Sequence, residues 1–344
     1  MWLPTINNMD VSIIIINYKS CALVMNCIES IVQQTIPGSY EIILVDNDSR
    51  DGAKEKILSK YKEVQWVEMG YNAGFARANN AGMRIAKGNF VLILNADTII
   101  LNDAINKSIE LLKNYPDAIG AGVQLLNTDG TTQISGAHFI RGGLNTLLPL
   151  PYLGRLIRYL GYKFKSTVPS VQDVHKDVEV DWVVGAYMLV KKEVLASAGL
   201  FDEDFFMYAE EIEWCARLRK QGKLVLFAAP AITHIGGGTS SDYYSTEETE
   251  NGKNLWNKKG RQIIVSNMLR IRKQFGVGWF LLMIGTYVFE IPVFAICLLI
   301  DKIINGSKVI YSWKNVQDYI SNMAVLLKYF FKMLLNKKYF YKVA

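Results

Sequence analysis

The sequence of 344 residues is short of cysteine and of charged side chains. Its four cysteines stand at positions 21, 27, 215 and 297, and none belongs to a Cys-x-x-Cys motif. The sequence therefore indicates neither a disulfide framework nor a structural zinc site, and a reducing compartment fits it best. Charged residues make up 20% of the chain and hydrophobic residues 50%. This balance is apolar for an enzyme that stays in solution.

Several other sequence signals are missing. The N-terminus has no charged segment followed by an apolar stretch and a small-residue cleavage site, so we expect no signal peptide. We find no internal repeat and no low-complexity tract. The first expected strand is followed by no Gly-rich loop with a basic residue for a triphosphate, which argues against a nucleotidyltransferase.

The positive charge of the chain lies in its C-terminal tail. Residues 301–344 contain eight lysines and two aspartates, which accounts for the whole net charge of +6. Apolar and aromatic residues recur at helical spacing among these lysines between residues 318 and 340, as in an amphipathic helix at a membrane surface. This mixture suits lipid better than nucleic acid, so we expect no nucleic-acid partner.

Strand and helix patterns alternate through the first third of the chain. This order predicts a mainly parallel sheet built from βαβ units and flanked by helices. Further on, residues 128–135 read as a hairpin, 144–172 as a poorly patterned loop, 178–190 as regular structure, 209–221 as a helix and 224–228 as a strand. The expected early strands are 11–17, 41–45, 64–68 and 90–94, and the expected helices are 21–34, 52–61, 74–86 and 101–114.

A carboxylate follows one of these buried strands directly. Residues 90–94 run into Asn95, Ala96 and Asp97. Ligands of open α/β sheets lie outside the carboxyl ends of the strands, and a carboxylate there suits a divalent cation shared with nucleotide phosphates. Taken alone, an Asp at the end of a strand is more often part of a turn or a helix cap than a metal ligand.

A second acidic cluster opens the helix expected at residues 209–221. Glu210, Glu211 and Glu213 lie within four positions, directly after Phe-Phe-Met-Tyr at residues 205–208. Glu213 is explained by the helix dipole and by an i,i+4 pair with Arg217. For Glu210 and Glu211 the apolar surroundings indicate a carboxylate with a raised pKa, which suits a general base.

The third candidate is His234, which precedes three glycines at residues 236–238. A single histidine is usually structural. Here the glycines permit close backbone approach to a phosphate, so the imidazole is a candidate ligand for a metal ion or a phosphate.

Residues 277–300 form an apolar stretch interrupted by Glu290 and Pro292. The stretch is nearly long enough to cross a bilayer. The interruptions favour a hairpin-like insertion, an interfacial insertion or two short helices, and a pair of buried core helices is the alternative. Basic residues on both sides would attract an anionic leaflet.

Taken together and in order, these motifs resemble family 2 inverting glycosyltransferases of GT-A fold, in the rhamnosyltransferase-like branch that builds bacterial surface polysaccharides. The resemblance covers about residues 10–240. It implies a GT-A domain at 1–250, with a mainly parallel sheet, and a membrane-associating helical region at 251–344. The motifs that carry it lie at residues 11–18, 44–52, 72–82, 94–97, 199–203, 210–214 and 234–238.

The resemblance also implies roles for single residues. Asp97 would hold Mg²⁺ or Mn²⁺ together with His234, and Asn95 departs from the usual acid-x-acid form of that motif. Glu211 matches the catalytic base, with Glu210 as its competitor. The donor nucleotide-sugar would contact Tyr18, Asp46, Asn47, Asn72, Gly74, Arg77, Asn80, Asn95 and Asp97, and the acceptor would contact Trp182 and Gly185.

The expected activity is transfer of a sugar by single displacement. The best guess for the donor is dTDP-rhamnose, and a UDP-hexose is the alternative within the same fold. The acceptor would be a lipid-linked saccharide at the cytoplasmic face of the bacterial inner membrane, in O-antigen, capsule or cell-wall synthesis. A sugar-nucleotide-binding or nucleotidyltransferase protein is the competing class, and homo-oligomerisation is left open.

Overall fold

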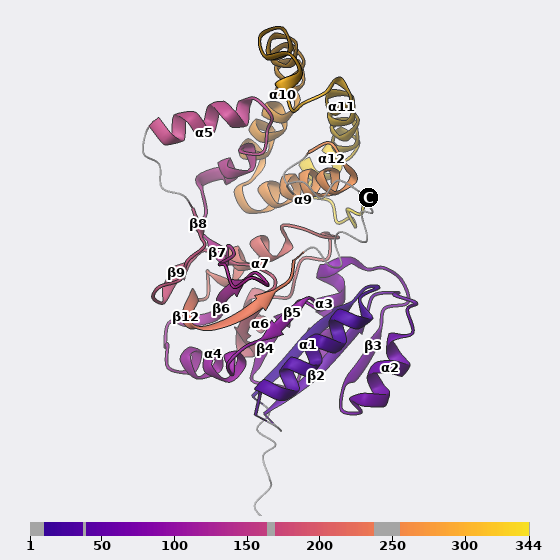
Figure 1. Cartoon of the computed structure of the whole chain (residues 1–344), viewed down its shortest axis with the longest axis vertical. Coiled ribbons are helices and arrows are strands. Elements are labelled where there is room, and N and C mark those ends of the chain that lie inside the picture. The colour runs from indigo at the N-terminus through magenta and orange to yellow at the C-terminus, as the bar shows by residue number, and fades with distance from the viewer. Residues whose placement is uncertain (1–9, 37–38, 164–168, 237–254, 344) are drawn as a thin grey trace, which may run out of the picture. The chain divides into compact units, whose positions relative to one another are not determined.

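The computed structural model describes residues 10–36, 39–163, 169–236 and 255–343, and all structural statements below refer to them (Figure 1). The chain divides into two compact units. The sheet unit consists of Met1–His138, Ser170–Glu203 and Trp214–Ser245, and the helical unit of Phe139–Pro169, Asp204–Glu213 and Thr246–Ala344. The expected boundary at residue 250 lies outside the described residues. The helical unit also takes in two segments that precede that boundary.

The main sheet of the sheet unit has its strands in the order β3-β2-β1-β4-β11-β6-β12-β5, with β9 paired to β12. Strands β1 to β4 pair in parallel, whereas β11 runs antiparallel between β4 and β6. The sheet is therefore mixed and mainly parallel, as predicted. Its strands are β1 (Val11–Asn17), β2 (Tyr40–Asp46), β3 (Gln65–Glu68), β4 (Phe90–Leu94), β5 (Thr98–Ile100), β6 (Ala118–Leu126), β9 (Val178–Val180), β11 (Tyr187–Lys191) and β12 (Lys223–His234).

Helices cover both faces of this sheet, because its central strands carry apolar side chains on both faces. Ile13 and Ile15 of β1 share one core cluster with Val24 and Ile28 of the first helix. On the other face, a side chain at Gly82 would meet Ile14, so this glycine lets its helix lie close to β1. The helices are α1 (Cys21–Gln34), α2 (Ala53–Lys60), α3 (Gly74–Ile85), α4 (Ala104–Lys113), η2 (Lys192–Val194) and α6 (Leu195–Ala198).

Residues 178–190 form short strands rather than one continuous element. Strands β9 and β11 join the main sheet, whereas β10 (Trp182–Val183) pairs with β7 (Gly136–Ala137) and β7 with β8 (Ser170–Val171) in a small second sheet. Strand β12 is longer than the five residues expected. Its register shifts between Phe227 and Ala231, and Pro230 lies in this irregular stretch, where a strand tolerates a missing N–H group.

The helical unit contains a helix that the sequence analysis placed in a loop. Residues 144–172 are not a featureless loop, because they include part of η1 (Arg141–Leu147) and all of α5 (Leu153–Lys163). The N–H groups of Tyr152 and Leu153 donate to Glu290 Oε1 and Oε2 at 2.7 and 3.1 Å. Glu290, which lies far along the chain, thus accepts hydrogen bonds from two N–H groups at the N-terminus of α5. This contact explains why a buried acid occurs in an apolar helix.

The C-terminal part of this unit is a bundle of α9 (Lys258–Phe275), α10 (Val277–Asn305), α11 (Trp313–Lys328) and α12 (Phe330–Leu334), with η3 (Gly306–Lys308) between α10 and α11. Residues 277–300 form one continuous helix through Pro292, so the expectation of two short helices or a hairpin is wrong. The amphipathic pattern of 318–340 is divided between α11 and α12 at Tyr329.

Helix α10 packs against the rest of the helical unit with one of its faces. Its buried residues Phe280, Met283, Tyr287, Glu290, Phe294 and Leu298 recur every three or four positions. Within the described residues it is the helix long and apolar enough to cross a bilayer. Its polar groups are nevertheless bound inside the unit, since the Tyr287 hydroxyl donates to a carbonyl of η1 at 2.6 Å.

Candidate functional site

The polar residues expected to bind the donor begin where β1 and β2 end. The register pairs Asn17 with Asp46, which places both at the carboxyl edge of the sheet. Asn17 Nδ2 donates to Asp46 Oδ1 at 2.9 Å, and the Ser49 N–H donates to Asp46 Oδ2 at 3.2 Å. The loop that follows has left-handed φ values at Asp48, Arg50 and Gly52. The Asp46 carboxylate is therefore held at the entrance of a tightly turned loop.

Asn47 joins this loop to the start of α3. Its Nδ2 donates to Asn72 Oδ1 at 3.2 Å, and its Oδ1 accepts from the Ala73 N–H at 2.7 Å. The Gly74 N–H donates to Asn72 Oδ1 at 3.1 Å. Four of the residues expected at the donor site, Asp46, Asn47, Asn72 and Gly74, therefore lie at one edge of the sheet.

Asp97 and His234 meet at the same edge, because the end of β12 pairs with β5 in the register His234–Thr98. The side chain of Asp97 is 6% exposed, and its Oδ1 lies 3.5 Å from His234 Nε2. Gln133 Nε2 donates to Asn127 Oδ1 and to the His234 carbonyl, so its Oε1 is left as an acceptor. His234 Nδ1 lies 2.9 Å from that Oε1 and is therefore the protonated nitrogen.

This arrangement fits a divalent cation. When Nδ1 donates to Gln133, Nε2 faces the Asp97 carboxylate, so that a nitrogen and an oxygen that can both bind a metal ion lie 3.5 Å apart. Gln133 orients the ring in the manner of a partner behind a metal ligand. Among the described residues no three His, Cys, Asp or Glu side chains form a closed metal site. A cation held by Asp97 and His234 would thus keep positions for water and phosphate oxygen.

The other expected donor residues are placed as follows. Asn80 is 1% exposed, and its amide donates to the Phe201 carbonyl at 2.9 Å and accepts from the Phe201 N–H at 3.0 Å. Arg77 Nε donates to the Glu203 carbonyl at 2.9 Å. Asn80 and Arg77 therefore fasten α3 to the 201–203 turn, and their contact with a donor stays a prediction. Tyr18 and Asn95 follow β1 and β4, Trp182 begins β10, and Gly185 precedes β11.

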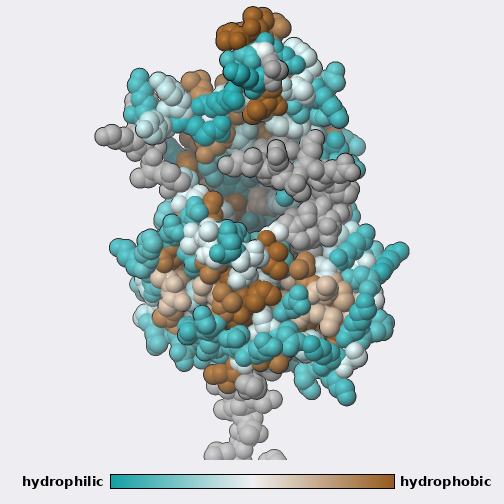
Figure 2. Space-filling view, in the orientation of Figure 1, coloured by the Kyte–Doolittle hydropathy of each residue, from teal (hydrophilic) through white to brown (hydrophobic). Residues whose placement is uncertain are grey.

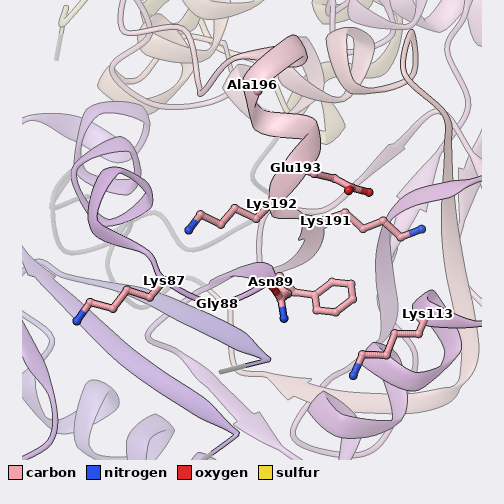
Figure 3. A pocket seen from close by; sticks show the side chains of 9 residues that line it. Lys87, Gly88, Asn89, Lys113, Lys191, Lys192, Glu193 and Ala196 are labelled. Carbon is pink, nitrogen blue, oxygen red and sulfur yellow. The ribbon is translucent and has the colours of Figure 1, made fainter. Parts of the chain in front are cut away.

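A hollow of about 610 Å³ lies at the opposite edge of the sheet (Figure 3). Its lining includes Phe90, the first residue of β4, and four lysines, Lys87, Lys113, Lys191 and Lys192. Lys192 donates to the Ala86 carbonyl at 2.6 Å. Because the expected donor residues follow the other ends of β1, β2 and β4, we do not place the donor in this hollow.

The acidic cluster belongs to the helical unit and follows a strained turn. Tyr208 and Ala209 have φ values of 71° and 66°, and neither is glycine. Left-handed backbone at such residues costs roughly 1–3 kcal/mol each and is concentrated at functional sites. Helix α7 (Glu210–Leu218) begins directly after them. The turn therefore fixes the direction in which the first two glutamates leave the backbone.

Glu210 is 4% exposed and Glu211 is half-buried, and the two acids have different surroundings. Burial raises the pKa of Glu210 well above its usual value, and the neighbouring Glu211 raises that pKa further. Burial also raises the pKa of Glu211, but the Arg270 charge opposes this rise. One Oε2 of each glutamate is buried without a hydrogen-bond partner among the described atoms. Of the two acids, Glu211 is therefore the one whose pKa is lowered by a nearby cation, Arg270.

Arg270 reaches this pair from α9. The residue is 2% exposed, its Nη1 donates to Gln274 Oε1 at 2.9 Å, and its guanidinium lies 5.8 Å from the Phe275 ring centre. Burial lowers its pKa to about 10, while Glu211 raises that pKa. Gly143, with a φ of +73°, lets the backbone of η1 approach the guanidinium closely. Arg270 thus remains charged at neutral pH.

The segment that carries the two glutamates is fastened by the C-terminal bundle. Lys273 Nζ donates to Asp204 Oδ2 at 2.7 Å, and the Tyr341 N–H donates to the Asp204 carbonyl at 2.9 Å. The Ser266 hydroxyl donates to the Met207 carbonyl at 2.7 Å. The C-terminal helices expected only to bind a membrane therefore also position the candidate base.

The sequence analysis did not predict the roles of two residues, Gln133 and Arg270. Gln133 lies in the expected hairpin, and only its position as a polar residue close to the end of a strand could have indicated a role. Arg270 was noted as a basic residue beside an apolar stretch, whereas it is a buried counter-charge. Residues 237–240, which include two of the three expected glycines, lie outside the described residues.

Comparison with known proteins gives a consistent result. Residues 12–172 match the family model Glycosyl transferase family 2. A low-salt glycan biosynthesis hexosyltransferase of Haloferax volcanii is 28% identical over 216 residues, which cover 62% of this chain and 62% of that protein. An N-acetylglucosaminyl-diphospho-decaprenol L-rhamnosyltransferase of Mycobacterium tuberculosis is 26% identical over 217 residues, which cover 58% of this chain and 68% of that protein.

Among solved structures, that of a mannosyltransferase from Pyrobaculum calidifontis with GDP-Man and Mn²⁺ matches 95% of this chain and 87% of that one, at a TM-score of 0.48 and 15% identity. The family match begins within β1 and includes Asp46, Asn47, Asn72 and Asp97. Residues 12–172 therefore match glycosyltransferase family 2, and hexosyltransferases, rhamnosyltransferases among them, are relatives of this chain.

Proposed function

We propose that the protein transfers a sugar from a nucleotide-diphospho-sugar to a hydroxyl group of a lipid-linked saccharide, with inversion at the anomeric carbon. The observation that supports this most is the pair of acids Glu210 and Glu211, which follows a strained turn and has Arg270 as a counter-charge to Glu211. dTDP-rhamnose is the first donor to test and a UDP-hexose the second, because rhamnosyltransferases and other hexosyltransferases are among the relatives.

In the proposed reaction Glu211 is the base. Its carboxylate accepts the proton of the acceptor hydroxyl as the oxygen attacks the anomeric carbon. The new C–O bond forms while the bond to the phosphate oxygen breaks, and the nucleoside diphosphate leaves with the electron pair. Burial and the neighbouring Glu211 raise the pKa of Glu210 well above its usual value, whereas the Arg270 charge opposes the rise at Glu211. Glu211 is therefore the acid that we propose as the ionised base.

The donor would lie along the carboxyl edge of the sheet. Asp46 and Asn47 are proposed to contact the base and ribose, and Asn72 and Gly74 to line the same pocket. Asp97 and His234 would hold Mg²⁺ or Mn²⁺, which would offset the charge that develops on the leaving diphosphate. Trp182 and Gly185 are proposed on the acceptor side.

We place this reaction at the cytoplasmic face of the bacterial inner membrane, in the synthesis of O-antigen, capsule or cell-wall polysaccharide. This location is supported by the M. tuberculosis relative, whose name specifies a decaprenol-linked substrate, and by the apolar helix α10. The chemistry proposed for the active site does not depend on whether the protein forms a homo-oligomer.

The test is a panel of nucleotide-sugars with release of nucleoside diphosphate as the readout. Glu211→Gln is expected to lower turnover at least about a hundred-fold, as is typical of a lost general base, while donor binding is retained. Glu210→Gln keeps a neutral, hydrogen-bonding side chain and is expected to retain most activity. Full turnover by Glu211→Gln, or a greater loss in Glu210→Gln, would assign the base differently.

A further inference from the structure

Helix α5 carries an apolar and basic surface that nothing in the described chain covers fully. Leu156, Tyr159, Leu160 and Tyr162 are 52%, 61%, 40% and 86% exposed, and Leu156, Tyr159 and Leu160 follow the three-and-four spacing of one helix face. Apolar side chains gathered in this way usually mark an interaction surface.

The charge on α5 has one sign. The helix contains Arg155, Arg158 and Lys163 and no acidic residue. Asp301 of α10 lies 3.6 Å from Arg155, whereas Arg158 donates only to the uncharged carbonyl of Leu148. The surface therefore complements a negatively charged partner.

Helix α10 lies beside α5 in the same unit (Figure 1) and exposes a second apolar surface. Phe289, Ile296, Ile300, Ile303 and Ile304 are 48–75% exposed. Figure 2 shows apolar side chains gathered at the C-terminal end of this helix. The bonds from Tyr152 and Leu153 to Glu290, and from the Tyr152 hydroxyl to Asp301 at 2.8 Å, fix α5 against α10. The two surfaces therefore move as one body.

We propose that α5 and the exposed face of α10 form one surface that docks on an anionic lipid bilayer. Basic side chains beside exposed leucine, isoleucine and tyrosine are the pattern of helices that lie in the membrane interface. The inference deepens the proposed function, since a lipid-linked acceptor would be reached from this position. It assigns docking to α5, outside the C-terminal region in which the sequence analysis looked.

The contacts of α10 favour an interfacial position over a membrane crossing. Glu290 lies at the middle of the helix and binds the N-terminus of α5. A bilayer-spanning α10 would bring this end of α5, with Arg155 and Arg158, to the centre of the hydrocarbon, where charged groups are costly. In the interface the same cations lie among lipid headgroups.

Flotation of the full chain with vesicles tests the proposal. The wild type is expected to bind vesicles that contain phosphatidylglycerol more tightly than pure phosphatidylcholine vesicles. Leu156→Ser with Leu160→Ser should lower binding at least about ten-fold, because two exposed apolar side chains are lost from the contact. Lys163→Glu should weaken the preference for phosphatidylglycerol. Val32→Ser, at a 45% exposed position of α1, is the matched control.

Equal flotation of the double variant and the wild type would overturn the proposal. So would sedimentation showing a dimer that the double variant dissociates while vesicle binding is unchanged, because the surface would then bind a second copy. Turnover with a water-soluble acceptor is measured in parallel. A chain that binds vesicles through α5 but transfers no sugar contradicts the proposed function alone, and the converse result contradicts the docking alone.

Discussion

Replacing Arg270 by methionine should move the pH dependence of the reaction. Arg270 is 2% exposed, and its charge counteracts the rise that burial imposes on the Glu211 pKa. A nearby opposite charge typically lowers the pKa of a carboxyl group by about 1–3 units. Without it the Glu211 pKa rises further, so the base is ionised only at higher pH. We expect the acidic limb of the kcat/KM profile to shift to higher pH.

The assay is release of nucleoside diphosphate between pH 5 and 10, with the folded fraction measured at each pH, because substitutions at buried sites commonly destabilise a protein by about 0.5–3 kcal/mol. At low pH the variant should have a lower kcat/KM than the wild type, and the difference should narrow as the pH rises. Arg270→Lys keeps a charge and should shift less. Arg272→Met, in the same helix, is the control. A loss of equal size at every pH would refute the electrostatic role.

Four further outcomes are expected. Asp97→Asn should raise the Mn²⁺ concentration needed for half-maximal turnover by at least about ten-fold, and unchanged metal dependence would exclude Asp97 as a ligand. Gln133→Leu should lower the affinity for Mn²⁺ about 10- to 100-fold, because the His234 ring is no longer held in place. Mn²⁺ binding as tight as in the wild type would contradict this role of Gln133. Asp204→Ala should lower the free energy of unfolding by about 3 kcal/mol, since Lys273 is left buried, as denaturant titration would show. Glu290→Ala should lower the free energy of unfolding by about 1–3 kcal/mol by exposing the N-terminus of α5, and a melting curve like that of the wild type would disprove the cap.

The alternating first part of the fold was predictable because each element there carries its own pattern. Strands β1 and β4 lie at the residues expected, and α1 does too. Long apolar runs bounded by turn residues need little help from the rest of the chain. Asp97 was expected at the carboxyl end of its strand by the same logic, whereas Asp46, Asn47, Asn72 and Gly74 were implied by the family resemblance.

The elements that were predicted wrongly or not predicted at all depend on contacts with residues far along the chain. Helix α5 is short, and its N-terminus is capped by Glu290 of α10, so residues 144–172 show no local signal. Helix α10 continues through Pro292 because one face packs along the bundle. The role of Arg270 was hidden for a related reason: a buried arginine and a surface arginine look the same in a sequence, and only packing distinguishes them.

The candidate base and the helices that we propose to face lipid belong to one compact unit, in which Lys273 and Tyr339 bind Asp204 from more than sixty positions away. Strain imposed on one part of a closely packed unit is transmitted to the rest of that unit. Leaving the bilayer would then change the environment of the glutamates as well as access to the acceptor. Detergents and short-chain acceptors that free the protein from membranes would for this reason alter turnover itself.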